Sequence, residues 1–182
     1  PMELATPEAF EEDPALVWEW YDWRRSIISK IQPNPAHYAI AELEKRYAEF
    51  TLITQNVDGL HLLAGSAKTI ELHGSIWTLK CVECGNLSEN REVPIKILPR
   101  CSCGGLLRPG VVWFGESLPE GSLFRAFEAS SNAEVMLVVG TSGVVQPAAS
   151  LALRAKGAGA FVVEINPEET QLSGSLDMRL SG

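Results

Sequence analysis

Apolar positions in the first quarter of the chain recur with the three- and four-residue spacing of helices buried on one side. Three dipeptides place a capping side chain directly before a proline, a combination that suits the first turn of a helix. They are Thr6-Pro7, Asp13-Pro14 and Asn34-Pro35. The pattern predicts consecutive helices within residues 6–48, the last of them over about 35–48.

The apolar pattern then changes to short uninterrupted runs that are rich in β-branched residues. These runs are FTLIT (50–54), EVMLVVG (134–140) and AFVVEI (160–165). Such runs are typical of parallel strands that helices bury on both faces. Residues 147–159 have the pattern of a crossover helix ending at glycine. We expect an open α/β fold with a parallel sheet and helices on both faces, interrupted over about 78–109 by a small cysteine-bearing module.

Polar residues follow the carboxyl end of each predicted strand. QNVDGLH follows the first run, Gly140, Thr141 and Ser142 follow the second, and Asn166 follows the third. In open α/β sheets this edge is where ligands bind. The plain alternative is that polar residues simply terminate strands. Three such clusters together favour a ligand, and the Gly140–Ser142 turn before a helix suits a phosphate resting on backbone N–H groups.

The second predicted helix carries an arginine among apolar residues. The apolar stripe of this helix comprises Val17, Trp20, Tyr21, Ile27, Ile28 and Ile31. Arg24 is expected on this stripe, three residues after Tyr21, whereas Arg25 is expected to point about 100° away into solvent. A guanidinium keeps its proton, so burying Arg24 demands an anionic or strongly accepting partner. That partner is either one of the 23 acidic residues of the chain or a bound ligand.

Composition narrows the classes of partner. The 182 residues include 46% hydrophobic residues and carry a formal net charge of −8, which describes a soluble domain and argues against nucleic-acid or anionic-membrane binding. No apolar run is long enough to span a bilayer, and no signal peptide opens the chain. We expect a cytoplasmic protein, or an organelle-matrix protein if a targeting segment was removed upstream of Pro1.

Four cysteines lie close together in the sequence, at Cys81, Cys84, Cys101 and Cys103. Paired cysteine knuckles at this separation give Zn²⁺ four thiolates, and the crowding suits a metal site in a reducing compartment better than free thiols or a disulfide. The second knuckle is Cys-x-Cys, one residue shorter than the usual spacing. With all four positions occupied by thiolates, the predicted zinc would be structural, with no open position for catalysis.

A succession of motifs makes the chain resemble the sirtuins, the NAD-dependent protein-lysine deacylases. The motifs are TQNVDGLHLLAG (54–65), ELHGS (71–75), the four cysteines, LRPGVVWFGE (107–116), VVGTSGVVQPAA (138–149) and EIN (164–166). The resemblance covers nearly the whole chain. It implies a Rossmann-like NAD-binding domain over 1–77 and 110–182, with helices lining an acyl channel within about 6–48, and a zinc-binding module over 78–109.

The resemblance also assigns roles to residues. It makes His73 the general base that takes a proton from a ribose hydroxyl of NAD, a task that suits a group with a pKa near 6.5. Asn56 is implied as a second catalytic residue. The residues implied to bind NAD are Gln55, Asn56 and Asp58 at the nicotinamide and its ribose, Gly140, Thr141 and Ser142 beside the phosphates, and Asn166 at the adenosine ribose.

Two further segments match the substrate side of the family. Val112, Phe114, Gly115 and Glu116 match the segment that pairs with the main chain of an acyl-lysine peptide or protein as an added strand. The alternative for this segment is an ordinary buried strand.

The Tyr-x-x-Arg motif of the desuccinylase and demalonylase branch is matched by Tyr21 and Arg24. Their three-residue spacing lets both side chains reach one carboxylate. The resemblance therefore implies removal of succinyl, malonyl and glutaryl groups from lysine, with weaker deacetylation, to give nicotinamide and O-acyl-ADP-ribose. A plain deacetylase, an ADP-ribosyltransferase and a non-catalytic acyl-lysine-binding module stay open as alternatives. The family's first strand and glycine-rich loop are expected upstream of Pro1.

Overall fold

The computed structural model describes residues 3–182, which form two compact units, one extending to Leu118 and one from Pro119 to Gly182. The first unit begins with three helices: α1 (Pro7–Glu12), α2 (Pro14–Ile28) and α3 (Pro35–Arg46). Each begins where the sequence predicts, because the side chains of Thr6, Asp13 and Asn34 accept hydrogen bonds from backbone N–H groups of the first turn. Among residues 3–182, no helix is both long and apolar enough to cross a bilayer.

The predicted parallel pairing is confirmed in both units. In the first unit, β1 (Leu52–Thr54) pairs in parallel with β2 (Thr69–Glu71), and the short helix α4 (Leu60–Leu63) lies between them in sequence. In the second unit, β6 (Val135–Val139), β7 (Phe161–Ile165) and β8 (Met178–Leu180) form a parallel sheet in that order. A one-turn 3-10 helix, Ser173–Ser175, precedes β8.

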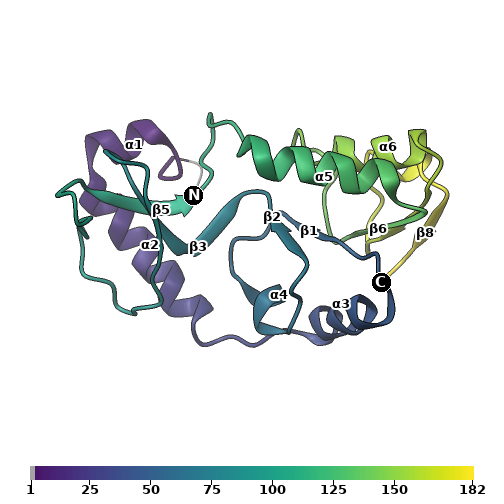
Figure 1. Ribbon diagram of the computed structural model, residues 1–182, viewed down its shortest axis with the longest axis horizontal. Helices are drawn as coiled ribbons and strands as arrows, with labels where there is room; N and C mark the ends of the chain where they lie inside the picture. Colours follow the sequence, from purple (N-terminus) through teal and green to yellow (C-terminus); the bar gives the residue numbers. More distant parts are fainter. Residues whose placement is uncertain (1–2) are drawn as a thin grey trace. The chain divides into compact units, whose positions relative to one another are not determined.

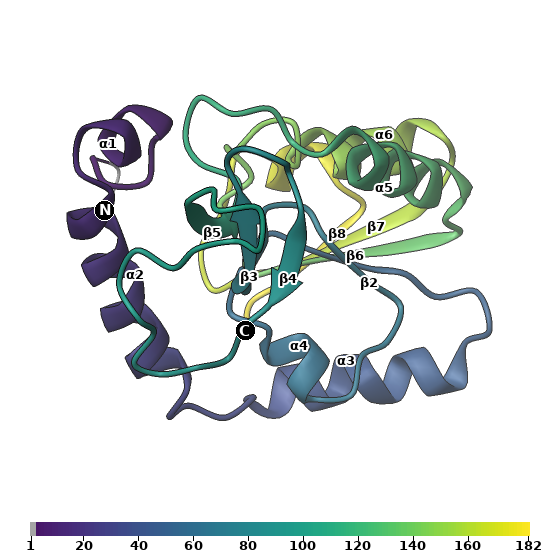
Figure 2. The ribbon, with the colours of Figure 1, turned by 60° about the vertical axis from the view of Figure 1, so that its left-hand side comes forward.

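Within the second unit, helices lie on one face of this sheet. Helix α6 (Ser150–Gly157) packs on β6 and β7 and on α5 (Glu120–Asn132), as Figure 2 shows. Side chains alternate between the faces of a strand, so the face of β6 opposite Val138 is left open. Val135, Leu137 and Val139 are 61%, 44% and 45% exposed there.

An antiparallel sheet carries the cysteines. Strand β3 (Gly74–Cys81) lies between β4 (Leu87–Glu89) and β5 (Leu107–Val111). Gly74 begins β3 with φ of 73°, and a Cβ there would lie 2.1 Å from the carbonyl oxygen of Gly110. Only glycine allows the two backbones to approach so closely.

Helix α2 packs on this antiparallel sheet (Figure 1). It buries a different face from the one its sequence suggests. Val17, Trp18 and Tyr21 are buried in the core against residues of β3 and β5. The helix rotation that buries these three side chains also buries Arg25, which is 0% exposed. Ile27 and Ile31, expected on the buried stripe, are 45% and 41% exposed.

The prediction that Arg24 is the buried arginine and Arg25 the exposed one is therefore wrong. The Arg25 guanidinium donates to the carbonyl oxygen of Ile76 at 3.2 Å, to the carbonyl and side-chain oxygens of Asn90 at 2.6 and 2.5 Å, and to the carbonyl oxygen of Glu92 at 3.1 Å. All four acceptors are neutral. Burial lowers the pKa of Arg25 from its usual value, but this group remains charged at any physiological pH.

Candidate active site and zinc cluster

The four cysteine sulfurs come together at the end of the antiparallel sheet. All four lie within 4.8 Å of one another, and the Sγ–Sγ distances are 3.5 Å for Cys81–Cys103, 3.8 Å for Cys84–Cys101 and 3.6 Å for Cys84–Cys103. Zn–S bonds of about 2.3 Å place the sulfurs of a tetrahedron about 3.8 Å apart. The cysteines are free rather than disulfide-bonded. The donor set and its spacing therefore fit a structural Zn²⁺, and the short Cys-x-Cys knuckle does not prevent it.

The thiols also need a cation for electrostatic reasons. A hydrogen bond from the backbone N–H of Cys103, with further help from neighbouring thiols, lowers the pKa of the Cys101 thiol to about 6. The N–H of Gly105 acts in the same direction on Cys103, but the surrounding thiol groups outweigh it and raise the pKa of that thiol to about 12. Four neighbouring thiols cannot all lose their protons without a compensating charge, which a divalent metal supplies.

The loop after β1 presents amide and carboxylate side chains at the carboxyl end of the strand. The N–H of Asn56 donates to the Thr54 hydroxyl at 3.1 Å, and the N–H of Leu60 donates to the Asp58 carboxylate at 2.8 Å. The Trp77 indole donates to the backbone oxygen of Asp58 at 2.7 Å. These bonds hold the predicted site residues Asn56 and Asp58 in a fixed turn.

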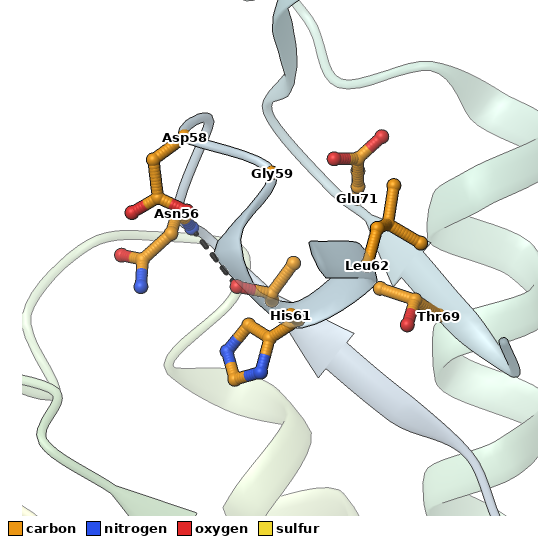
Figure 3. Close-up of a pocket in the computed structure, with 8 residues that line it drawn as sticks. Asn56, Asp58, Gly59, His61, Leu62, Thr69 and Glu71 are labelled. Carbon is orange, nitrogen blue, oxygen red and sulfur yellow. Dashed lines mark hydrogen bonds between the residues drawn. The ribbon is translucent and has the colours of Figure 1, made fainter. Parts of the chain in front are cut away.

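A small pocket opens beside this turn. Figure 3 shows Asn56, Asp58 and His61 around it, with Thr69 and Glu71 contributed by β2. Burial and the nearby Asp58 raise the pKa of Glu71, whereas burial and the neighbouring His37 lower the pKa of His61. Both shifts are in the direction of the neutral form.

His73 follows β2 and is half-buried. Its Nδ1 lies 3.0 Å from the backbone carbonyl oxygen of Gln55. A carbonyl oxygen can only accept, so Nδ1 carries the proton of the neutral ring and Nε2 keeps a lone pair. The backbone oxygen of His73 accepts from the N–H of Val112 at 2.9 Å, which joins this residue to the segment after β5. The arrangement provides a base at Nε2.

Arg24 lies on the wall of an open pocket, although it is not the fully buried arginine. The same pocket is lined by Ile28, Ile31 and the residues 55–58 of the loop after β1. The guanidinium carbon lies 4.9 Å from the ring centroid of Trp20 and 5.9 Å from that of Tyr21. Among residues 3–182, no acidic side chain forms an ion pair with Arg24. The structure thus places Arg24 in one pocket with Gln55, Asn56 and Asp58.

Tyr21 is 2% exposed and lies under the segment after β5. Its hydroxyl oxygen accepts a hydrogen bond from the Trp113 indole at 2.8 Å. Burial raises the pKa of Tyr21, outweighing that bond and the nearby cations, so the phenol is neutral at physiological pH.

The predicted substrate segment 112–116 forms a turn rather than a strand. The Glu116 carboxylate accepts two bonds from the Arg108 guanidinium at 2.6 and 2.8 Å, and one from the N–H of Trp113 at 2.8 Å. The N–H of Phe114 donates to the oxygen of Ala5 at 3.0 Å, and the Phe114 side chain is 58% exposed. Gly115 is exposed with φ of 88°, which lets the chain turn there.

In the second unit, the remaining predicted residues lie at the carboxyl ends of β6 and β7. The side chain of Asn166 donates to the backbone oxygen of Thr141 at 2.8 Å, and the N–H of Gly140 donates to the oxygen of Ile165 at 3.0 Å. Gly140 has φ of 62° and open space where a Cβ would be. Helix α6 begins only at Ser150, so the Gly140–Ser142 turn does not stand at its N-terminus as expected.

Sequence reasoning missed three residues of this region: Arg25, Arg108 and Trp113. Arg108 and Trp113 fall within LRPGVVWFGE, so the motif was available as a signal. Their contacts with Glu116 and Tyr21 depend on tertiary packing.

Comparison with known proteins places these observations in context. A family model described as the Sir2 family matches residues 1–147. The chain is 59% identical over 180 residues to an NAD-dependent protein deacylase of Aquifex aeolicus, covering 98% of this chain and 75% of that protein. It is 54% identical over 183 residues to NAD-dependent protein deacylase 2 of Pyrobaculum aerophilum, covering 100% and 74%.

Solved structures of Sir2 proteins are also similar to this chain. A Sir2 homolog in complex with NAD is 52% identical, with a TM-score of 0.95 over 100% of this chain and 72% of that one. A Sir2 protein bound to an acetylated peptide is 33% identical, with a TM-score of 0.91 over 98% of this chain and 77% of that one.

Proposed function

The chain belongs to the Sir2 family, and from this premise we propose that it is an NAD-dependent protein-lysine deacylase that prefers acidic acyl groups. The deacylase activity is supported by relatives named for it and by similar structures that hold NAD or acetylated peptide. The preference for succinyl, malonyl and glutaryl lysine over acetyl lysine is supported by one observation. Arg24 faces a pocket beside the loop after β1 without an acidic partner in residues 3–182.

The residues present fit NAD at two places. Asn56 and Asp58 offer an amide and a carboxylate at the carboxyl end of β1, suited to the nicotinamide and its ribose. In the second unit, Gly140, Thr141 and Ser142 offer an uncrowded turn for the phosphates, with Asn166 beside it for the adenosine ribose. When bound, NAD would supply the ribosyl carbon that the acyl carbonyl oxygen attacks, with nicotinamide as the leaving group.

His73 would act as the general base. The Gln55 carbonyl accepts from Nδ1, so Nε2 is left to take a proton from a ribose hydroxyl. The predicted Zn²⁺ would have four protein ligands and no open position, so it is not proposed to take part in this step. Zinc is proposed only to hold the antiparallel sheet and its loops.

Arg24 would receive the distal carboxylate of the acyl group. Its planar fork can donate two parallel hydrogen bonds to one carboxylate, and the half-buried surroundings strengthen them. The apolar side chains of Ile28 and Ile31 line the same pocket and would pack against the methylene groups of the acyl chain. The same apolar wall accepts an acetyl group, so weaker deacetylation is expected.

The test compares matched peptides. Arg24→Met in the complete gene product should lower kcat/KM for succinyl and malonyl peptides by about thirtyfold or more, because a charge-assisted pair is worth roughly 2 to 5 kcal/mol. Acetyl turnover should fall far less. O-acyl-ADP-ribose measured by mass spectrometry is the readout, and Arg46→Met, an exposed arginine at the end of α3, is the control. Equal losses on both kinds of substrate would reject the acidic preference.

A further inference from the structure

Glu164 is a buried acidic residue that the proposed reaction does not use. It lies on β7, two residues before Asn166, and is 1% exposed. Its two carboxylate oxygens each accept a hydrogen bond from a hydroxyl, one from Thr170 and one from Ser173. Within residues 3–182, no lysine, arginine or histidine forms an ion pair with it. A carboxyl group buried without a cation depends on such donors, because losing them would leave it unsatisfied.

Both donors belong to one loop, residues 166–175, which follows β7 and includes the one-turn 3-10 helix. The N–H of Leu172 donates to the Thr170 hydroxyl at 3.1 Å, and the N–H of Thr170 donates to the Ser173 hydroxyl at 2.8 Å. Each hydroxyl therefore accepts from the backbone of the loop and donates to Glu164. Because β7 is held in the sheet between β6 and β8, this carboxylate is a fixed point to which the loop is tied.

The 166–175 loop in turn supports the turn after β6. Leu172 is 6% exposed, and a Cβ at Gly143 would lie 3.0 Å from its side chain, so the two segments are in close contact. Gly143 directly follows the Gly140–Ser142 turn. Asn166, at the start of the loop, donates to the backbone oxygen of Thr141 at 2.8 Å. The loop therefore contacts this turn at two places.

We propose that Glu164 is a positioning residue for NAD, which holds the 166–175 loop in the shape that keeps Asn166 at the adenosine ribose and supports the Gly140–Ser142 turn at the phosphates. The inference rests on the proposed function, which assigns those residues to NAD. In dinucleotide-binding folds an acidic residue beyond a strand can bind a ribose hydroxyl itself. Glu164 is not placed for that role, because its side chain is buried and protein hydroxyls bind both of its oxygens.

The experiment measures the dissociation constant of ADP-ribose for the complete gene product by isothermal titration calorimetry. Glu164→Gln keeps the size of the side chain but replaces one acceptor oxygen by an amide donor, so one hydroxyl of the loop loses its partner. The dissociation constant should rise about tenfold, because the apparent affinity falls with the fraction of protein whose loop is ordered. KM for NAD should rise in parallel, whereas kcat at saturating NAD and KM for the acyl peptide should not change.

Two controls separate this role from a general loss of stability. Glu168→Gln is the same exchange at an exposed position of the same loop and should change neither stability nor ADP-ribose binding. Val163→Ala weakens β7 itself, since Val163 is 7% exposed and its side chain points to the face of the sheet opposite Glu164. This second control should lower the free energy of unfolding and leave the dissociation constant unchanged.

Thr170 provides a second test, which also applies if Glu164→Gln fails to fold. Thr170→Val lacks the hydroxyl and should raise the dissociation constant of ADP-ribose about tenfold, as Glu164→Gln does. Thr170→Ser keeps the hydroxyl and should bind ADP-ribose as the native protein does. If Thr170→Ser raised the dissociation constant as much as Thr170→Val, the bond to Glu164 would not be the cause, and the inference would be rejected.

The remaining outcomes separate the inference from the proposed function. If Asn166→Ala weakens ADP-ribose binding while Glu164→Gln does not, the proposed NAD site stands and the role of Glu164 is rejected. If Val163→Ala weakens binding as much as Glu164→Gln, loss of stability explains the effect and the role is again rejected. If the native protein binds no ADP-ribose and turns over no acyl peptide with NAD, the proposed function itself fails.

Discussion

Arg24 and Arg25 are neighbours on one helix, yet they lie in opposite kinds of surroundings. Arg25 is fully buried, and its guanidinium is bound by neutral oxygens of Ile76, Asn90 and Glu92. Arg24 is half-buried on a pocket wall, against aromatic rings, with no acidic partner in residues 3–182. The comparison teaches that burial alone does not identify a ligand-binding arginine. The two terminal nitrogens of the buried Arg25 are bound by the protein, although its Nε has no partner in residues 3–182, whereas Arg24 lies on the wall of the pocket.

Removal of zinc should have the largest effect on the surroundings of Arg25. Asn90 and Glu92 lie between the two cysteine knuckles, so the acceptors of Arg25 depend on the fold of that segment. Structural zinc is worth on the order of 10 kcal/mol in small modules. Chelation should therefore unfold residues 82–106, which hydrogen exchange would detect as lost protection. Full protection in metal-free protein would show that the cysteines are not a zinc site.

Arg25→Met should have the next largest effect. It leaves the oxygens of Ile76, Asn90 and Glu92 without their donor, and each buried acceptor left unsatisfied costs about 1 to 3 kcal/mol. Urea denaturation monitored by tryptophan fluorescence measures the loss. Activity, where the variant folds, should fall equally on succinyl and acetyl peptides. A selective loss on succinyl peptides would assign Arg25 a role that its contacts do not indicate.

A third arginine, Arg108, is paired with the carboxylate of Glu116, so the stability that this pair contributes should depend on pH. Burial tends to raise the pKa of Glu116, but hydrogen bonds from Arg108 and the Trp113 N–H outweigh it and lower that pKa below its usual value. A lowered carboxyl pKa contributes stability that is complete above the unfolded pKa of about 4.3 and is lost as the pH falls through the folded value. Thermal unfolding is measured at pH values from about 6 to about 3, which span the titration of a carboxyl group. Acidification over this range should lower the unfolding temperature less in Glu116→Gln than in the native protein. An identical acid-side loss in both would contradict the pairing.

Arg24→Met should have the smallest effect on stability. Its guanidinium only packs over Trp20 and Tyr21, so the free energy of unfolding should change by less than about 0.5 kcal/mol. Urea denaturation beside Arg25→Met provides a direct comparison. If Arg24→Met lowered the free energy of unfolding as much as Arg25→Met does, Arg24 would be a structural residue. The proposal that it binds an acyl carboxylate in the pocket would then lose its support.

Local signals predicted much of the fold. The caps at Thr6, Asp13 and Asn34 act within one turn, and the cysteine spacing constrains a few residues, so both could be interpreted without tertiary information. The rotation of α2 could not. The helix has apolar residues on two faces, with Trp18 buried and Trp23 58% exposed, so periodicity does not determine which face packs. The assignment of Arg24 and Arg25 depended on that choice.

The roles of the site residues stay predictions from the motifs that named His73, Asn56 and Asp58. In the structure Asn56 and Asp58 lie in the loop after β1 and His73 lies just after β2, because the carboxyl ends of neighbouring parallel strands meet at one edge. The Trp113–Tyr21 bond joins segments far apart in the chain, and no local pattern encodes it. The turn at 112–116 likewise follows from the Arg108–Glu116 ion pair, which depends on how β5 packs.

The acceptor that orients His73 belongs to the main chain of Gln55. Every amino acid placed at position 55 would present the same carbonyl, so no single exchange of side chain there deletes the contact. The protonation pattern of the imidazole is therefore protected against point mutation, and only an insertion, a deletion or a shift of β1 relative to β2 would disturb it.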